Sequence, residues 1–230
     1  MIRKFTSIII ILFLLICSSD AKAWIGFYLA PNCTFYPMKG NARTQGRLNT
    51  GIGLQGGFLF ITNTSHTTSF RIDLSYSWSG TKADIHLAAD DNKYVKRIEG
   101  NFNFYCLMIS PKIQFNILSE KCAFISFGIS PRLISTNGNG TAIHSYSPDS
   151  RFNGKDFNYL FKRVAVAANI GIGYQEIKIG SVTLFAEINE SYDISTITYT
   201  YYTYPWRALT TSLIIGIRMY KNQKYSNEYN

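Results

Sequence analysis

The sequence predicts an all-β protein, an eight-stranded antiparallel transmembrane β-barrel whose strands follow one another around the ring in an up-and-down meander. Three observations predict this fold class. Apolar and polar residues alternate with a period of two, the connections between the alternating segments are short and long in turn, and 46% hydrophobic and 15% aromatic residues accompany only 16% charged ones. A typical soluble domain has about 25% charged residues. The composition therefore favours a surface that meets lipid.

The first 23 residues have the layout of a cleavable secretory signal. Arg3 and Lys4 come first, an apolar run covers residues 8–16, and Ala21 and Ala23 precede Trp24. Charged, apolar and small-residue regions in that order are typical of such signals, and the apolar run is shorter than the ~20 residues of a spanning helix. We expect a signal peptide over residues 1–23, a barrel domain over 24–220 and a polar C-terminal tail over 221–230.

The alternation is clearest in residues 69–79. Its two sides are Phe70, Ile72, Leu74, Tyr76 and Trp78 against Ser69, Arg71, Asp73, Ser75, Ser77 and Ser79. Only an extended strand separates such sets onto two faces. Similar patterns predict the other seven strands over residues 24–36, 50–61, 101–117, 122–135, 163–175, 182–195 and 208–220. An even number of strands is typical of a closed bacterial barrel.

The connections form a second, independent pattern. The short ones cover residues 62–67, 118–121 and 176–181, and the long ones cover 38–49, 80–100, 136–162 and 196–207. Turn formers at residues 137–140 and 153–154 support the third long loop. Short turns at one end and long loops at the other are typical of outer-membrane barrels. We therefore expect a bacterial outer-membrane location, with both termini in the periplasm and the long loops outside the cell.

The second face of the strands is rich in small and polar residues, which suits a crowded interior because side chains fill an eight-stranded barrel. If this second face points inward, the alternation places seven charged residues in the interior, namely Arg71, Asp73, Lys112, Arg132, Arg163, Glu187 and Arg218. Buried charges must be paired or hydrated. We hypothesise that Asp73 and Glu187 neutralise interior arginines and that the network plugs the barrel. A narrow conducting channel is the alternative.

Three prolines test the strand assignment. Pro31, Pro111 and Pro131 lie inside predicted strands, although a closed barrel has no free edge to accommodate a missing backbone N–H. We expect a bulge or kink at each of them. The alternative is that those strands end there.

Several segments of the second half of the chain together suggest a family. They are residues 105–116, 124–133, 170–174, 184–189 and 213–220, and in the first half only residues 51–57 contribute. With these segments the chain resembles the PorT-like family of outer-membrane β-barrels of Bacteroidetes. The resemblance implies an outer-membrane barrel. Named members of the family take part in gliding or type IX secretion, and an accessory role in such machinery is a second alternative for this chain.

Aromatic residues in the long loops indicate a binding surface for an extracellular protein or glycan. They are Tyr199, Tyr201, Tyr202, Tyr204, Trp206, Tyr146, Phe157 and Tyr159. Tyr and Trp provide large contact areas at low entropy cost. An aromatic girdle at the lipid head groups is an equally good interpretation of the same residues.

We expect no enzyme, no cofactor and no metal site, because His66, His86 and His144 fall in separate connections without fixed acidic partners. A lipid-modifying enzyme is the least favoured alternative. The expected partners are outer-membrane lipid, the outer-membrane assembly machinery and the loop ligand. Without the signal the chain has a net charge of +7, from 20 basic and 13 acidic residues. These basic residues are scattered, so nucleic acid is not an expected partner.

Overall fold

The computed structural model describes residues 23–36, 46–63, 67–88, 95–117, 123–144, 147–153, 163–179, 182–197 and 207–220. They form ten strands, which are β1 (Ala23–Phe35), β2 (Gly46–Leu48), β3 (Gly51–Asn63), β4 (Thr68–Ala88), β5 (Val95–Asn116), β6 (Ala123–His144), β7 (Ser147–Asn153), β8 (Val164–Ile179), β9 (Val182–Asp193) and β10 (Leu209–Tyr220). Within these residues, no helix has the length and apolar character needed to cross a membrane.

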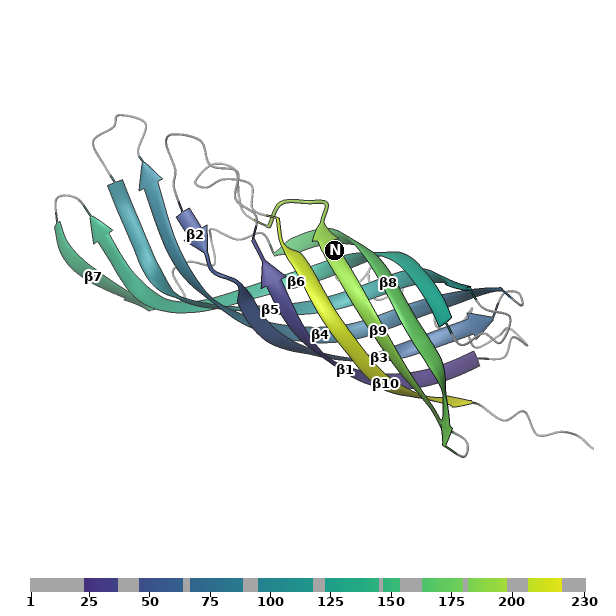
Figure 1. Ribbon diagram of the computed structural model, residues 1–230. Coiled ribbons are helices and arrows are strands. Elements are labelled where there is room, and N and C mark those ends of the chain that lie inside the picture. The colour runs from purple at the N-terminus through teal and green to yellow at the C-terminus, as the bar shows by residue number, and fades with distance from the viewer. Residues whose placement is uncertain are drawn as a thin grey trace, which may run out of the picture.

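Eight of the strands close into a barrel. The order of hydrogen-bonded neighbours is β4-β3-β1-β10-β9-β8-β6-β5, and β5 pairs again with β4. All of these pairs are antiparallel, and the strands cross the barrel at a tilt (Figure 1). The predicted eight-stranded antiparallel barrel is confirmed. Trp24 pairs with both Ile61 and Tyr220, so β1 begins and β10 ends at the short-turn end.

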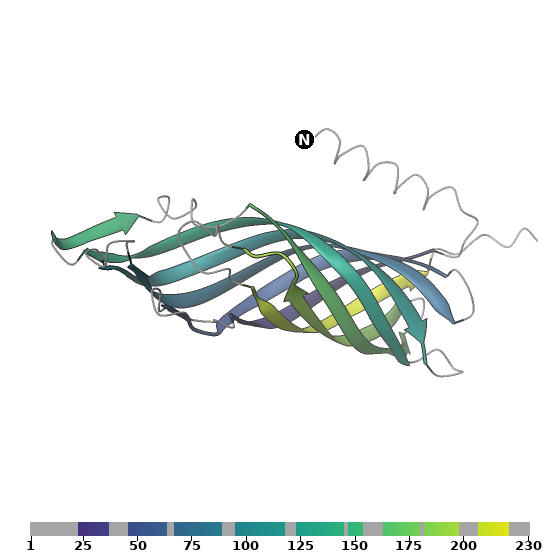
Figure 2. The ribbon, with the colours of Figure 1, turned by 90° about the horizontal axis from the view of Figure 1, so that it is seen from above.

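Three strands are longer than the alternation predicts. β4 and β5 remain paired as far as Ala88 and Val95, and β6 stays paired with β5 as far as His144. These strands project beyond the barrel body, together with β2 on β4 and β7 on β6 (Figures 1 and 2). The loops expected over residues 80–100 and 136–162 are therefore wrong for most of their length.

The turn formers at residues 137–140 predict a loop, but a close approach between two strands gives the glycine at residue 138 a different role. Gly138 pairs with Phe102 on the neighbouring strand, and a Cβ atom on Gly138 would lie 2.7 Å from Phe102 Cδ1. A glycine is needed here because the aromatic ring lies over the strand at this position. Gly138 does not form a turn. Residues 137–140 are instead part of β6.

The prolines do not produce the expected bulges. Pairing between β5 and β6 stops after Met108↔Arg132 and resumes at Lys112↔Gly128 in the same register. Pro111 and Pro131 both fall in this one gap, while Pro111 stays paired with β4 and Pro131 with β8. In an antiparallel strand the N–H and C=O of one residue point to the same neighbour. Each proline therefore interrupts the ladder on one side only, and the two interruptions coincide.

The outer face of the barrel carries the apolar set. Exposed fractions reach 62% for Leu29, 72% for Ile52, 57% for Ile172 and 55% for Ile215, residues that come from four different strands. Monomeric soluble proteins rarely expose contiguous apolar patches larger than a few hundred Å². An apolar surface on so many strands of a closed barrel is suited to hydrocarbon, and the polar face lies inside.

A charge placed on this outer face tests the lipid contact. Leu74 lies midway between Phe70 and Trp78 in the outward row of β4 and is 40% exposed. We expect Leu74→Arg to lower the free energy of unfolding in phospholipid bilayers by about 2–4 kcal/mol, because the guanidinium meets the hydrocarbon midplane. Urea titration in bilayers measures the change, with Leu74→Phe as the apolar control. Equal stability of the two variants would contradict a lipid-facing position.

Candidate functional site

Four charged residues form a buried cluster in the middle of the barrel. Arg71 lies 2.6 Å from Asp73 through Nε and Oδ1, and 2.5 Å from Glu187 through Nη1 and Oε2. Lys112 Nζ lies 3.3 Å from Asp73 Oδ2 and 3.5 Å from Glu187 Oε1. Ser126 Oγ donates to Glu187 Oε1 at 2.8 Å. None of the four charged residues is more than 3% exposed, so each carboxylate is enclosed by cations and donors.

The cluster connects opposite walls of the barrel. Arg71 is on β4 and Glu187 is on β9, and these strands are four positions apart around the ring in either direction. An ion pair between them therefore crosses the full width of the bore. Lys112 on β5 adds a second crossing, because its Nζ donates to Asn189 Oδ1 on β9 at 3.0 Å. Side chains are expected to fill the interior of an eight-stranded barrel, and at this level the paired charges extend across it.

Glycines provide the space for these large interior groups. A Cβ atom on Gly171 would clash with Glu187 Oε1 and would lie 2.6 Å from Ser126 Oγ. A Cβ atom on Gly128 would lie 2.6 Å from Lys112 Cγ. The small residues on the inner face of the strands are thus located beside the charged side chains that need the room.

Arg218 is an interior cation without a carboxylate partner among the residues that the structure describes. Its guanidinium carbon lies 4.5 Å from the centre of the Phe185 ring and 5.7 Å from that of Phe124. Its Nη1 donates to Gln175, whereas Nε and Nη2 have no hydrogen-bond partner. Aromatic faces attract a guanidinium, so the two rings compensate part of the missing ion pair.

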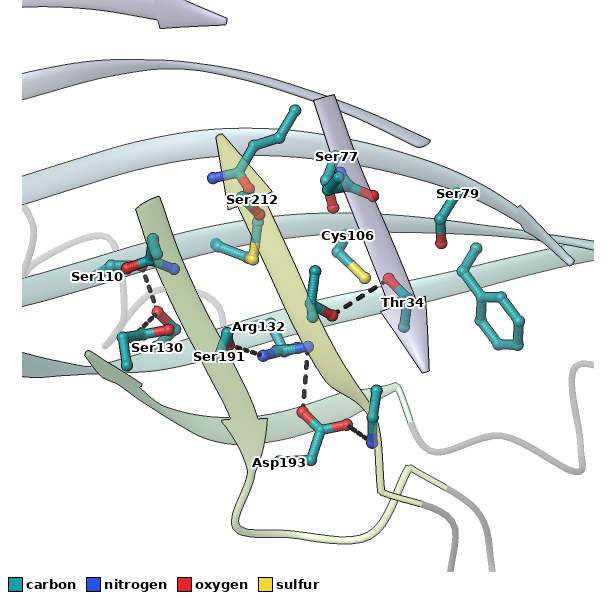
Figure 3. A pocket seen from close by; sticks show the side chains of 18 of the residues that line it. Thr34, Ser77, Ser79, Cys106, Ser110, Ser130, Arg132, Ser191, Asp193 and Ser212 are labelled. Carbon is teal, nitrogen blue, oxygen red and sulfur yellow. Dashed lines mark hydrogen bonds and ion pairs between the residues drawn. The ribbon is translucent and has the colours of Figure 1, made fainter. Parts of the chain in front are cut away.

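A polar cavity of about 60 Å³ lies between the charged cluster and the long-loop end. Hydroxyl groups are the most frequent polar groups in its wall, and Figure 3 labels Thr34, Ser77, Ser79, Ser110, Ser130, Ser191 and Ser212. The serines that precede the two prolines in the β5–β6 gap, Ser110 and Ser130, hydrogen-bond to each other across it. A polar cavity of this size has room for a few water molecules.

An ion pair closes one side of the cavity. Arg132 Nη1 lies 3.1 Å from Asp193 Oδ1, and Arg132 Nη2 donates to Ser191 Oγ at 2.9 Å (Figure 3). Asp193 Oδ2 also accepts the backbone N–H of Ala208 at 2.8 Å. Sequence reasoning missed Asp193, although it has the same parity as Glu187 along β9.

Six of the seven predicted interior residues are buried. Arg71, Asp73, Lys112 and Glu187 come together, Arg132 lies in the cavity wall, and Arg218 lies apart between its rings. The expectation for Arg163 is wrong, because the residue is exposed just before the start of β8. Its parity is that of the interior set, but the wall of the barrel does not extend over it.

All eight aromatic residues of the expected loop surface lie outside the described residues. They are Tyr146, Phe157, Tyr159, Tyr199, Tyr201, Tyr202, Tyr204 and Trp206. His66 also lies outside them. His86 and His144, which were expected in separate loops, belong to β4 and β6 on either side of β5. The described residues contain no group of His, Cys, Asp and Glu side chains that could hold a metal ion.

Comparisons with known proteins find likeness in structure only. No family model matches the sequence, and no curated protein matches it. Solved structures similar to this chain include Neisserial surface protein A, with 12% identity, coverage of 86% of this chain and 96% of that chain, and a TM-score of 0.45. Ail of Yersinia pestis has 11% identity, coverage of 87% and 100%, and a TM-score of 0.39. OprG of Pseudomonas aeruginosa has 6% identity, coverage of 88% and 97%, and a TM-score of 0.43. Likenesses this distant carry no function over to this chain.

Removing one carboxylate tests the central cluster. We expect Glu187→Ala to lower the free energy of unfolding by about 3–5 kcal/mol, because Arg71 and Lys112 would stay buried with one anion between them. The loss should appear as a lower melting temperature in a heat-modifiability gel. Glu190→Gln is the matched control: Glu190 is only half-buried, and it accepts from Thr211 Oγ1 at 2.7 Å. That variant should change stability by less than about 1 kcal/mol, and an equal effect of both would contradict a special role of the cluster.

A methyl group at Gly171 tests the packing around Glu187. We expect Gly171→Ala to destabilise the barrel by about 1–3 kcal/mol, because the new Cβ displaces the carboxylate from Ser126 and Arg71. Gly56→Ala is the control, since its Cβ would meet Leu29 Cδ2 at an ordinary 3.4 Å. Thermal melts of both variants in detergent make the comparison. A stable Gly171→Ala protein would show that the cluster tolerates rearrangement.

Proposed function

We propose that this chain is a structural or interaction protein of the bacterial outer membrane, with a bore that is closed to ions. The observation that carries the proposal is the Arg71–Glu187 ion pair, which joins strands on opposite sides of the ring at 2.5 Å. A barrel closed by its own side chains serves as an anchor, so its activity lies at its ends or on its outer surface. The interior network then provides stability.

The outer surface supports the membrane placement. Exposed apolar residues occur on all eight strands of the barrel, whereas the charged residues of the central cluster and of the cavity wall are buried inside. The described barrel has its first and last strand ends at the short-turn end. In the proposed orientation that end faces the periplasm, and the extensions of β4, β5 and β6 reach outside the cell.

The interaction role is proposed for the long-loop end. The projecting strands enlarge that end of the molecule (Figure 1), and the aromatic sequence of residues 198–206 supports a protein or glycan ligand. The resemblance to the PorT-like family agrees with a membrane barrel and leaves the ligand open. A role in secretion or gliding is compatible with the same anchor.

A narrow channel is the second candidate, and the polar cavity favours it. The cavity already takes up part of the long-loop half of the bore, so a channel would require only the central cluster to move. A lipid-modifying enzyme has less support, because no described cavity residue is a histidine. We propose a non-enzymatic role.

Single-channel conductance distinguishes the proposed closed anchor from the alternative of a narrow channel. In planar bilayers we expect the wild-type protein to show no single-channel steps, because the paired charges fill the bore. The double variant Arg71→Ala, Glu187→Ala removes both ends of the crossing ion pair, so we expect small steps from it. A heat-modifiability gel must show that the variant is folded. Regular steps from the wild type would reject the closed barrel and promote the channel.

A further inference from the structure

A groove lies on the outer surface beside β4, between the part of β4 that pairs with β3 and the part that pairs with β2. β3 pairs with β4 up to Gly80, and β2 pairs with it from Ala83 onward. Between the two ladders, the backbone N–H of Asn49 donates to Lys82 O at 2.9 Å, and Thr81 Oγ1 donates to Asn49 O at 2.5 Å. These bonds hold residues 49–50, which join β2 to β3, against β4. They leave a groove of about 500 Å³ beside it.

The groove is cationic and polar on one side and apolar on the other. Lys82 and Asn101 line it and are exposed, and the half-buried Asn103 lies beside them. Gly80 contributes no side chain, which keeps the groove open. Ile52 forms the opposite lip and is 72% exposed. Among the side chains that the structure describes, no carboxylate forms an ion pair with Lys82.

The groove lies where the apolar outer face ends. Trp78 is 42% exposed two residues before Gly80, and its Nε1 donates to Asn103 Oδ1 at 3.3 Å. Tryptophan is enriched at membrane–water interfaces, where its ring meets lipid and its N–H meets polar groups. Leu54, which is 49% exposed, continues the apolar face below Ile52. The polar side of the groove thus falls at head-group level on the long-loop side.

We propose that this groove binds the anionic, phosphate-bearing head group of a membrane lipid in the leaflet on the long-loop side. Lys82 supplies a compact positive charge with three donors for the phosphate. The amides of Asn101 and Asn103 can donate to and accept from head-group hydroxyls. The acyl chains lie along Ile52 and Leu54. The inference rests on the proposed membrane placement and adds a lipid class and a site to it.

Native mass spectrometry of the full chain tests the site. The protein is released from phosphatidylcholine nanodiscs that contain phosphatidylglycerol as the anionic probe, and the retained lipids are identified. We expect the wild type to retain phosphatidylglycerol preferentially. Lys82→Gln should reduce that preference about fivefold, the equivalent of the ~1 kcal/mol that one basic residue contributes near an anionic surface. Lys82→Arg should keep it.

Arg163→Gln is the matched control, because Arg163 is another exposed cation at the long-loop end of the barrel, just before the start of β8. It should leave the preference unchanged. No preference in the wild type, or equal losses in Lys82→Gln and Arg163→Gln, would overturn the proposal. Displacement of the lipid by inorganic phosphate would also overturn it in favour of a free-anion site. If the membrane placement itself were wrong, the protein would instead stay folded and dispersed without detergent or nanodiscs.

Discussion

The barrel depends on one ion pair that crosses its interior. Arg71 and Glu187 come from strands on opposite sides of the ring, and their contact at 2.5 Å fixes how the two walls face each other. Asp73 and Lys112 complete the charge balance of this cluster. Breaking such a pair leaves a buried charge alone, and this penalty favours a single arrangement of the side chains around it. The adjacent glycines are a consequence, since the carboxylate of Glu187 occupies the space that a side chain at Gly171 would take.

Burying charges inside is compatible with an apolar outside because the solvent of the outer face is lipid. Many leucine and isoleucine side chains are exposed on the outer face, whereas polar and charged side chains share the bore with a smaller apolar cluster that includes Leu59, Phe185 and Ile214. The prolines are accommodated within the ladder. Pro111 and Pro131 share one gap in the β5–β6 ladder, and the hydroxyls of Ser110 and Ser130 bond to each other beside it. One local irregularity therefore accommodates both missing N–H groups.

If the bore is closed, as we propose, the functional surfaces lie at the ends and on the outside of the barrel. The long-loop end carries the projecting strands β4, β5 and β6, and the groove beside Lys82 lies where the apolar outer face ends. We propose the first as the site for a ligand outside the cell and the second as the site for a lipid head group.

The sequence by itself determined the eight barrel strands and which face of each strand is polar, because the period of two is a local property of an extended chain. Parity alone placed Arg71 and Glu187 inside. It could not bring them together, since their contact depends on ring order and on strand stagger. Parity also placed Arg163 inside, and the turn formers around Gly138 predicted a loop. Both predictions are wrong because the length of the wall and the position of the Phe102 ring depend on neighbouring strands. The crossing ion pair, the cavity and the groove at Lys82 were decided only by the tertiary structure, in which residues far apart in the chain become neighbours.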